Sequence, residues 1–428
     1  MTLHNPNSYT DSNIRSVEKL KIAIENTVEN QEIIDIHTHL FSPPFGDLLL
    51  WGIDELLTYH YLIAEVFRKS DVTYDEFWSM NKTQQADLIW QKLFLENSPI
   101  SEACRGVVTT LDKLGLDVSS RNLKDYRDYF QSTSVESFID TVFAQSNVSK
   151  VVMTNDPFDP EEAPVWETGD TGDKRFEAAL RMDVLINNYE DTAYEQLRGL
   201  GYDVDPTLST EKGYKEVRRF LESWIHRMNP KYMAVSLPPD FKYPEDGVLG
   251  RLFDNCILPI SREYNVPFAL MIGVKRAVNP ELKMAGDGTG KADLESLETL
   301  LRENQDNKFL VTLLSRENQH ELCVIGRKFK NLMIFGCWWF MNNPSVIEEI
   351  TRERIELLGL SIIPQHSDAR ILDQLVYKWN HSRQIISNVL YEKYKTLLDV
   401  GWTITRSEIE RDVNNLFGGN FERFLSEN

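Results

Sequence analysis

Two histidines, His37 and His39, carry the clearest chemical signal in this sequence, within the stretch 33–40. The stretch has the pattern of a short buried strand, and side chains two positions apart on a strand point to the same face. The two imidazoles therefore converge on one point at the C-terminal end of that strand. Neutral imidazole is the commonest metal ligand in proteins, so the pair could supply half of a divalent metal site. The alternative is a histidine pair that merely alternates with hydrophobic residues.

A second polar group, His366, Asp368 and Arg370, alternates in the same way further along the chain. If the preceding strand extends that far, all three side chains face the same way. The Asp368 carboxylate could then complete a mononuclear site with the two histidines and leave positions open for water or substrate. The alternative for Asp368 is a loop salt bridge with Arg370. For His366, a structural role and a catalytic role are both open.

Three arginines, Arg181, Arg316 and Arg370, each follow a hydrophobic run. A single arginine in such a place is usually a solvated charge. If the three arginines surround the opening of one cavity, they predict an anion-binding pocket in this acidic protein. Guanidinium pairs with carboxylate as a bidentate fork, which favours a sugar acid over a neutral sugar as the ligand.

Aromatic residues complete the candidate site. Trp338 and Trp339 end another hydrophobic run, so one indole could face the pocket and stack on a sugar, although core packing is the default. His60 and Tyr61 lie in a helical stretch. If that stretch folds over the opening of the candidate site, His60 could contact substrate and Tyr61 could supply a phenol for proton transfer. Otherwise the two residues pack between helices.

Eight short hydrophobic runs must position these residues. Runs that are apolar throughout indicate strands buried on both faces, as in parallel sheets. Eight of them with helical connections favour a (β/α)8 barrel over an open sheet. The active site of such a barrel lies at the C-terminal ends of the strands, where the polar residues above cluster. The runs are 33–40, 150–154, 177–183, 232–237, 267–273, 308–315, 332–338 and 360–368.

The predicted organisation has three parts. Residues 1–30 form an N-terminal helical segment. Residues 31–53 and 143–428 form the barrel, which is distorted by a helical insertion, 54–142, directly after the first strand. This insertion is expected to act as a cap.

The composition limits the partners. The chain has 428 residues, of which 42% are hydrophobic and 26% charged, as in an ordinary globular protein. Its formal charge of −20 repels phosphate backbones and anionic lipid, so we expect neither nucleic-acid nor membrane partners. The four cysteines are scattered without a CxxC pair, which predicts free thiols in a reducing compartment and hence a cytoplasmic protein. A homo-oligomer is expected.

These residues resemble the uronate isomerase (glucuronate isomerase) family, a divergent branch of the metal-dependent amidohydrolase superfamily, and within it a shorter, bacillar-type subgroup. The HxH pair alone would indicate only the superfamily, whereas the paired tryptophans followed by Phe340 and Asn342 are more specific. The matching segments run in the expected order along almost the whole chain: 35–40, His60-Tyr61 with Arg68, Arg181, 336–342, 368–370 and 415–424.

The resemblance implies a distorted (β/α)8 barrel with one divalent metal, typically zinc. It implies His37, His39 and Asp368 as metal ligands, Arg181 and Arg370 as groups that hold substrate oxygens, and Tyr61 near the reacting end. The implied reaction interconverts D-glucuronate with D-fructuronate, and D-galacturonate with D-tagaturonate.

The chain departs from the family at two positions. Many members carry a histidine near the end of the fifth strand, where this chain has Met271. The common Thr-Asp-Ser-Arg of the eighth strand reads Ser-Asp-Ala-Arg at residues 367–370. The first departure puts a fifth-strand metal contact in doubt.

Aldose–ketose isomerisation moves a proton between C2 and C1 through a cis-enediolate. A divalent cation stabilises the negative charge that develops on the two adjacent oxygens. We expect Asp368, or a metal-bound hydroxide beside it, to shuttle the proton, with Tyr61 as the competing candidate. Arg370 and Arg181 would fix the open-chain substrate. Two alternatives remain: a mononuclear metal-dependent hydrolase of a sugar-acid lactone, ester or amide, and a sugar-acid-binding protein without catalysis.

Overall fold

The structure, a computed structural model, describes residues 13–427. Residues 1–12 of the predicted N-terminal segment, and residue 428, lie outside the described part of the chain.

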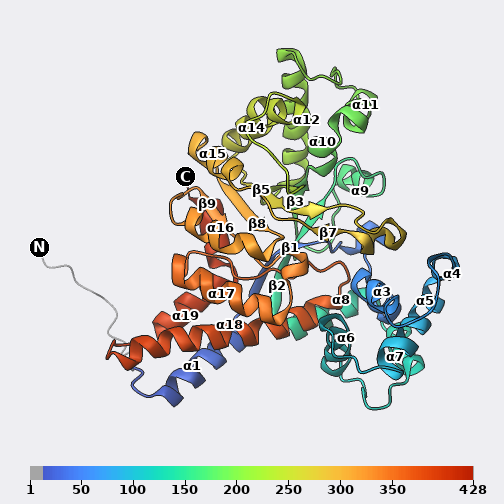
Figure 1. The fold of residues 1–428 in the computed structure, drawn as a ribbon, viewed down its shortest axis with the longest axis vertical. Helices are drawn as coiled ribbons and strands as arrows, with labels where there is room; N and C mark the ends of the chain where they lie inside the picture. Colours follow the sequence, from blue (N-terminus) through green and yellow to red (C-terminus); the bar gives the residue numbers. More distant parts are fainter. Residues whose placement is uncertain (1–12, 428) are drawn as a thin grey trace, which may run out of the picture.

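Seven parallel strands form one curled sheet at the centre of the protein (Figure 1). Each strand falls within, or within two residues of, a hydrophobic run predicted from the sequence, and β5 and β8 are buried along their whole length. Burial on both faces explains why these runs are apolar throughout. In their order across the sheet, the strands are β1 (Ile33–Thr38), β2 (Val148–Asn155), β3 (Phe176–Arg181), β4 (Met233–Leu237), β5 (Phe268–Ile272), β8 (Phe309–Leu313) and β9 (Leu332–Ile334).

The eighth predicted strand, residues 360–368, is wrong as a strand. Ile363 forms only an isolated bridge with Phe335, and the rest of the segment is irregular. Two residues explain the difference. Pro364 has no N–H to give to a ladder, and Asp368 has a left-handed backbone with φ of +52°.

The irregular segment nevertheless closes the ring. On the β9 side, the Gly336 N–H donates to the Ile363 carbonyl at 2.8 Å. On the β1 side, the Asp368 N–H donates to the His37 carbonyl at 3.1 Å, and the His39 N–H donates to the Ala369 carbonyl at 2.7 Å. The fold is therefore a distorted (β/α)8 barrel, as predicted, in which the eighth position is an extended segment and not a strand.

Helices cover the outside of the sheet (Figure 1). In α12, for example, the buried Val217, Leu221 and Trp224 recur three to four residues apart, so one face packs inward. The helices after β2 are α9 (Glu162–Thr168), α10 (Asp183–Asn187), α11 (Tyr194–Gly199), α12 (Glu211–Met228), α13 (Val248–Leu252), α14 (Leu258–Glu263), α15 (Glu295–Glu303), α16 (Gln319–Gly326), α17 (Pro344–Leu358), α18 (Gln374–Asp399), α19 (Arg406–Asn414) and α20 (Asn420–Ser426).

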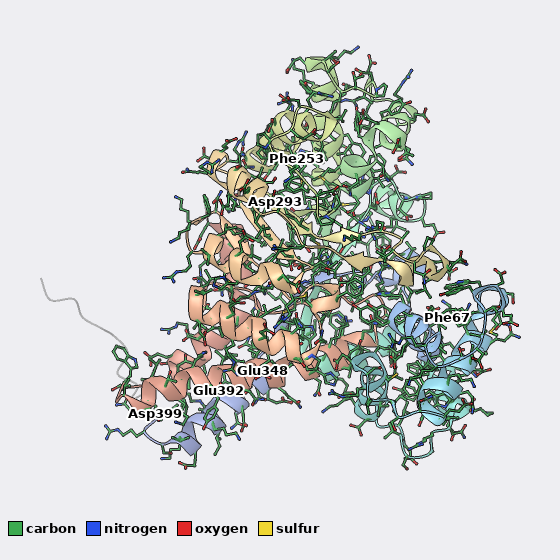
Figure 2. The ribbon with its side chains drawn as sticks, viewed as in Figure 1. Phe67, Phe253, Asp293, Glu348, Glu392 and Asp399 are labelled. Carbon is green, nitrogen blue, oxygen red and sulfur yellow. The ribbon has the colours of Figure 1, made fainter. Side chains whose placement is uncertain are left out.

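Helix α18 is the longest, with 26 residues, and runs along the base of the view in Figure 1 beside α1 (Val17–Asn30). Arg352 of α17 forms ion pairs with Glu348 of its own helix and Glu392 of α18, which lie near each other in Figure 2. Arg383 of α18 donates hydrogen bonds to carbonyls at the C-terminal ends of two other helices, α1 and α8 (Val135–Ser146). One buried guanidinium thus caps both helix ends.

Between β1 and β2 the chain forms helices, and no strand interrupts them. Beyond β5, a hairpin of β6 (Val274–Lys275) and β7 (Gly288–Thr289) reaches this insertion. There the Trp78 indole donates to the Glu281 carbonyl at 2.8 Å. The helices of the insertion are α2 (Ile53–Leu57), α3 (His60–Val66), α4 (Tyr74–Ser79), α5 (Lys82–Ile89), α6 (Glu102–Lys113), α7 (Leu123–Gln131) and α8 (Val135–Ser146).

All four cysteines are buried and free, as the sequence predicts. Among the described residues, no helix has both the length and the apolar character needed to cross a membrane.

Barrel closure makes a specific demand on Gly336. Its φ is +64°, and a Cβ there would lie 1.7 Å from Cδ2 of the buried His366. Gly115 has a similar φ of +76° but no neighbouring atom within 4 Å, which makes it a matched control. We expect Gly115→Ala to cost about 1–2 kcal/mol of backbone strain, and Gly336→Ala to cost about 1–3 kcal/mol more through overpacking. Urea unfolding followed by circular dichroism checks this. Equal losses would mean that His366 moves aside freely.

Candidate active site

The C-terminal ends of the strands surround a cavity of about 310 Å³, a size typical of small-molecule sites. Most of the residues singled out in the sequence line it. Its wall consists of His37, His39 and Asp368; the aromatic group Tyr59, His60, Trp338 and Trp339; the charged group Arg181, Asp183, Arg276, Asp287 and Arg370; and Thr154, Ala234, Val235, Ser236, Met271 and Met284.

His37, His39 and Asp368 form one cluster, with ligand atoms within 4.8 Å of one another. Asp368 Oδ1 lies 3.7 Å from Nε2 of His37 and 3.4 Å from Nε2 of His39. His37 Nε2 and Asp368 Oδ1 are buried and have no hydrogen-bond partner. Buried polar atoms without partners are costly, so this arrangement suits a cation between them. The group could hold a metal ion.

Tyr232 prepares His37 for this role. Its hydroxyl donates to the Ile36 carbonyl at 2.7 Å, so its oxygen is free to accept from His37 Nδ1 at 2.9 Å. With the proton on Nδ1, the lone pair of Nε2 faces Asp368. Burial, reinforced by His39, lowers the pKa of His37 to about 3. Burial, followed by the charge of Arg370, holds the pKa of His39 well below its usual value. Both imidazoles are therefore neutral at pH 7, as metal binding requires.

Asp368 itself is held in a disfavoured conformation. Its φ of +52° lies in the left-handed region, which non-glycine residues rarely adopt. Trp339, which also lines the cavity, is left-handed as well, with φ of +48°. Such conformations persist only where the surroundings enforce them, and they are frequent at functional sites.

The three arginines that line the cavity differ in their pairing. Nε of Arg181 donates to Asp183 at 3.1 Å, and Nη1 of Arg276 donates to Asp287 at 2.6 Å. Arg370 has no carboxylate within ion-pair distance among residues 13–427. Burial lowers its pKa from the usual 12.5, but an arginine stays charged at neutral pH. The unpaired guanidinium is therefore the one best suited to an anionic ligand.

Arg316 is the predicted substrate-binding arginine that the structure does not bring to the cavity. The chain turns after β8, and the guanidinium points outward, 57% exposed, to pair with Glu349 of α17 at 2.8 Å. Its assignment as a substrate-binding residue is corrected by this position. Arg276 is the third cavity arginine instead. It lies three residues past the fifth predicted run, so the strand-end rule could have found it.

Tyr61 and Arg68 also lie away from the main cavity. Tyr61 lines a neighbouring side cavity of about 250 Å³, where its ring stacks on Phe340 at 6.0 Å between centroids. Arg68 is exposed. Tyr59, which precedes α3, is the tyrosine that lines the main cavity. Residues two apart around the start of a helix point in different directions, so the position of the helix start decides which phenol faces the site.

Of the other residues singled out in the sequence, some line the main cavity and some do not. His60, Trp338 and Trp339 line the cavity, and Nε2 of His60 and Nε1 of Trp339 are buried without a partner. His366 lies beneath the site, with its ring 5.1 Å from that of His37, and does not line the cavity. Met271, at the position where the family resemblance implies a histidine in many members, lines the cavity. A fifth-strand metal ligand is thus absent from the described site.

We predict that Tyr232→Phe weakens metal binding, because His37 loses the acceptor that fixes its tautomer. Loss of such an outer partner typically costs about 10–100-fold in affinity. Chelator competition measures the change. Tyr126→Phe is the matched control, since Tyr126 is equally buried and its hydroxyl also donates to a backbone carbonyl, that of Asp117 at 2.9 Å, within the insertion. Unchanged metal affinity in Tyr232→Phe would contradict the role of the phenol.

No protein-family model and no curated protein matches the chain. Solved structures do match. An uronate isomerase from Bacillus halodurans C-125 is 57% identical with a TM-score of 0.95, covering 97% of this chain and 98% of that chain. An uronate isomerase from Thermotoga maritima is 17% identical with a TM-score of 0.74, covering 99% of this chain and 100% of that chain.

A glucuronate isomerase from Caulobacter crescentus is 15% identical with a TM-score of 0.75, covering 100% of this chain and 98% of that chain. At these two lower identities, the likeness shows the fold alone. The first comparison goes further, because it combines high identity with almost complete coverage of both chains. This chain belongs to the uronate isomerase family.

Proposed function

We propose that the protein interconverts D-glucuronate with D-fructuronate, and D-galacturonate with D-tagaturonate. One observation carries the proposal: a single cavity joins the His37–His39–Asp368 group to the unpaired guanidinium of Arg370. The first feature suits the carbonyl end of an open-chain sugar, and the second suits an anionic substrate. The 57% identity to an uronate isomerase supports this reading.

We infer that the cluster holds one divalent metal and that zinc is the best candidate, because two imidazoles and one carboxylate with open positions are typical of catalytic zinc. When bound, the ion supplies Lewis-acid stabilisation of negative charge on neighbouring oxygens.

The chain's own groups then have distinct roles. Arg370 binds an anionic oxygen of the substrate in charge-assisted hydrogen bonds. Trp338 and Trp339 cover the apolar face of the sugar and keep water away from the reacting carbons. Asp368 takes the proton from C2 and returns it to C1, because it is the carboxylate beside the cation site.

The two phenols near the site differ in access. Burial raises the pKa of Tyr59 above its usual value of 10, so this phenol stays protonated and can donate to a substrate oxygen. Tyr61 remains the competing candidate for proton transfer. To reach the main cavity, it would need the wall formed by Trp339 and Phe340 to move.

The cytoplasm is the proposed location, and it is supported by four free, buried cysteines, which suit a reducing compartment. A homo-oligomer stays a prediction.

The reaction is tested by proton NMR of D-glucuronate and D-galacturonate with the metal-loaded enzyme in deuterated water. We expect a ketose product that carries deuterium at the transferred position, and no product with Asp368→Asn. A ketose without deuterium would point to a shielded proton or to hydride transfer. No ketose from either substrate would overturn the proposal, and a panel of sugar-acid lactones would then test the hydrolase alternative.

Arg370→Gln should reduce kcat/KM for uronates by about 10–100-fold, because a hydrogen bond to a charged group is worth about 1.5–3 kcal/mol. Arg316→Gln is the control, since Arg316 is exposed and pairs with Glu349 outside the cavity. Steady-state kinetics on both uronates makes the comparison. Equal losses in the two variants would remove Arg370 from substrate binding.

A further inference from the structure

A polar stripe on α18 holds the irregular segment that carries Asp368. Gln374, Lys378 and Ser382 are spaced four residues apart, so they share one face of the helix. Each contacts a different residue of the segment. Gln374 accepts from the Arg370 N–H at 2.9 Å, Lys378 donates to the Ser367 carbonyl at 2.6 Å, and Ser382 accepts from the Gln365 amide at 3.2 Å.

Both backbone groups of Ser367, the residue before Asp368, are held by hydrogen bonds with side chains. Its N–H donates to Oδ1 of the buried Asp35 at 3.0 Å, and Oδ2 of Asp35 accepts from the Trp379 indole at 2.8 Å. The Ser367 carbonyl accepts from Lys378 and also from the Asn342 amide at 3.0 Å. These groups satisfy backbone atoms that a strand would have satisfied through a ladder.

The Lys378 contact bears directly on Asp368. The Ser367 carbonyl and the Asp368 N–H belong to the same peptide plane. Lys378 fixes the carbonyl end of that plane, and the His37 carbonyl accepts from its N–H end at 3.1 Å. The orientation of this plane sets φ of Asp368, which is +52°. A disfavoured conformation of this kind persists only if neighbouring groups impose it.

Burial of Lys378 needs an explanation of its own. The side chain is 5% exposed, and no carboxylate among residues 13–427 lies within ion-pair distance of its ammonium. Burying an ammonium without a paired anion costs stability, so a residue that gave only stability would be better apolar. The role of the ammonium therefore lies in its hydrogen bond to the Ser367 carbonyl.

We propose that Lys378 is a positioning residue, whose ammonium holds Asp368 in the left-handed conformation that aims its carboxylate at His37 and His39. The proposal rests on the metal site and reaction proposed above. It assigns no chemical step to Lys378 itself.

Lys378→Met tests it, because methionine keeps the apolar stem and removes the ammonium. We expect metal affinity to fall about 10–100-fold, as when other outer partners of a metal site are lost, and kcat to fall at least tenfold. KM for the uronate should change less than threefold, and the melting temperature should stay or rise. Lys308→Met is the matched control, since the partly buried Lys308 donates to the Leu425 carbonyl at 3.1 Å away from the cavity. It should leave all three functional values unchanged.

Two further variants keep the test decisive if Lys378→Met folds poorly. Asp35→Asn should show the same pattern, because it weakens the hydrogen bond that the Ser367 N–H donates to residue 35. Lys378→Ala should regain activity with ethylammonium, since Lys378 borders the side cavity of about 250 Å³, and this rescue should be absent in Asp368→Asn.

Wild-type metal affinity and kcat in Lys378→Met would overturn the proposal, as would losses that only follow a lower melting temperature. Failure of the proposed function looks different, because the wild-type protein would then yield no ketose. In that case the metal affinities of wild type and Lys378→Met still decide whether Lys378 positions Asp368. If the wild-type protein isomerises without metal, the kcat comparison decides. If it neither binds metal nor isomerises, both proposals fall.

Discussion

The structure depends on how the buried peptide groups of residues 364–370 are satisfied. Seven strands leave a gap in the barrel, and the segment that fills it contains a proline and a left-handed aspartate, so it cannot complete a ladder. Buried N–H and C=O groups must still be bonded. Side chains of α18 and Asp35 take the place of the missing ladder. Asp368 therefore owes its position to a helix face and not to a strand.

The net charge of the chain and the local charges of the cavity act on an anionic substrate in opposite ways. The chain carries a formal charge of −20, which would repel an anionic substrate at long range. At physiological ionic strength such repulsion is screened beyond about 8 Å, so local groups decide binding. Two cavity arginines are neutralised by Asp183 and Asp287, and Arg370 is left with an unpaired charge. A buried charge has its strongest effect where water is excluded, so Arg370 offers an anion in the cavity a positive charge that no protein carboxylate among residues 13–427 neutralises.

The sequence predicts those parts of the site that depend on local pattern. Apolar runs located seven strands, and alternation placed His37 and His39 on one side. Arg316 and Tyr61 were predicted to lie at the cavity, but both side chains lie outside it. The direction of Arg316 depends on the path of the loop after β8, and that of Tyr61 on where α3 begins. Tyr232 left no sequence signal, since it stands before β4, at the end of the strand opposite the cavity, and its contact with His37 forms only in the folded barrel.

Helix α18 contacts both the strand that carries His37 and His39 and the segment that carries Asp368. Near the start of β1, Arg383 donates to the Gln31 carbonyl at 2.7 Å, and within the strand the Trp379 indole binds Asp35. Lys378, next to Trp379, holds the peptide before Asp368. Metal ligands must keep their relative positions to within about 0.5 Å. Because His37 and Asp368 come from segments more than 300 residues apart, a single helix that contacts both segments is the simplest way to maintain that spacing.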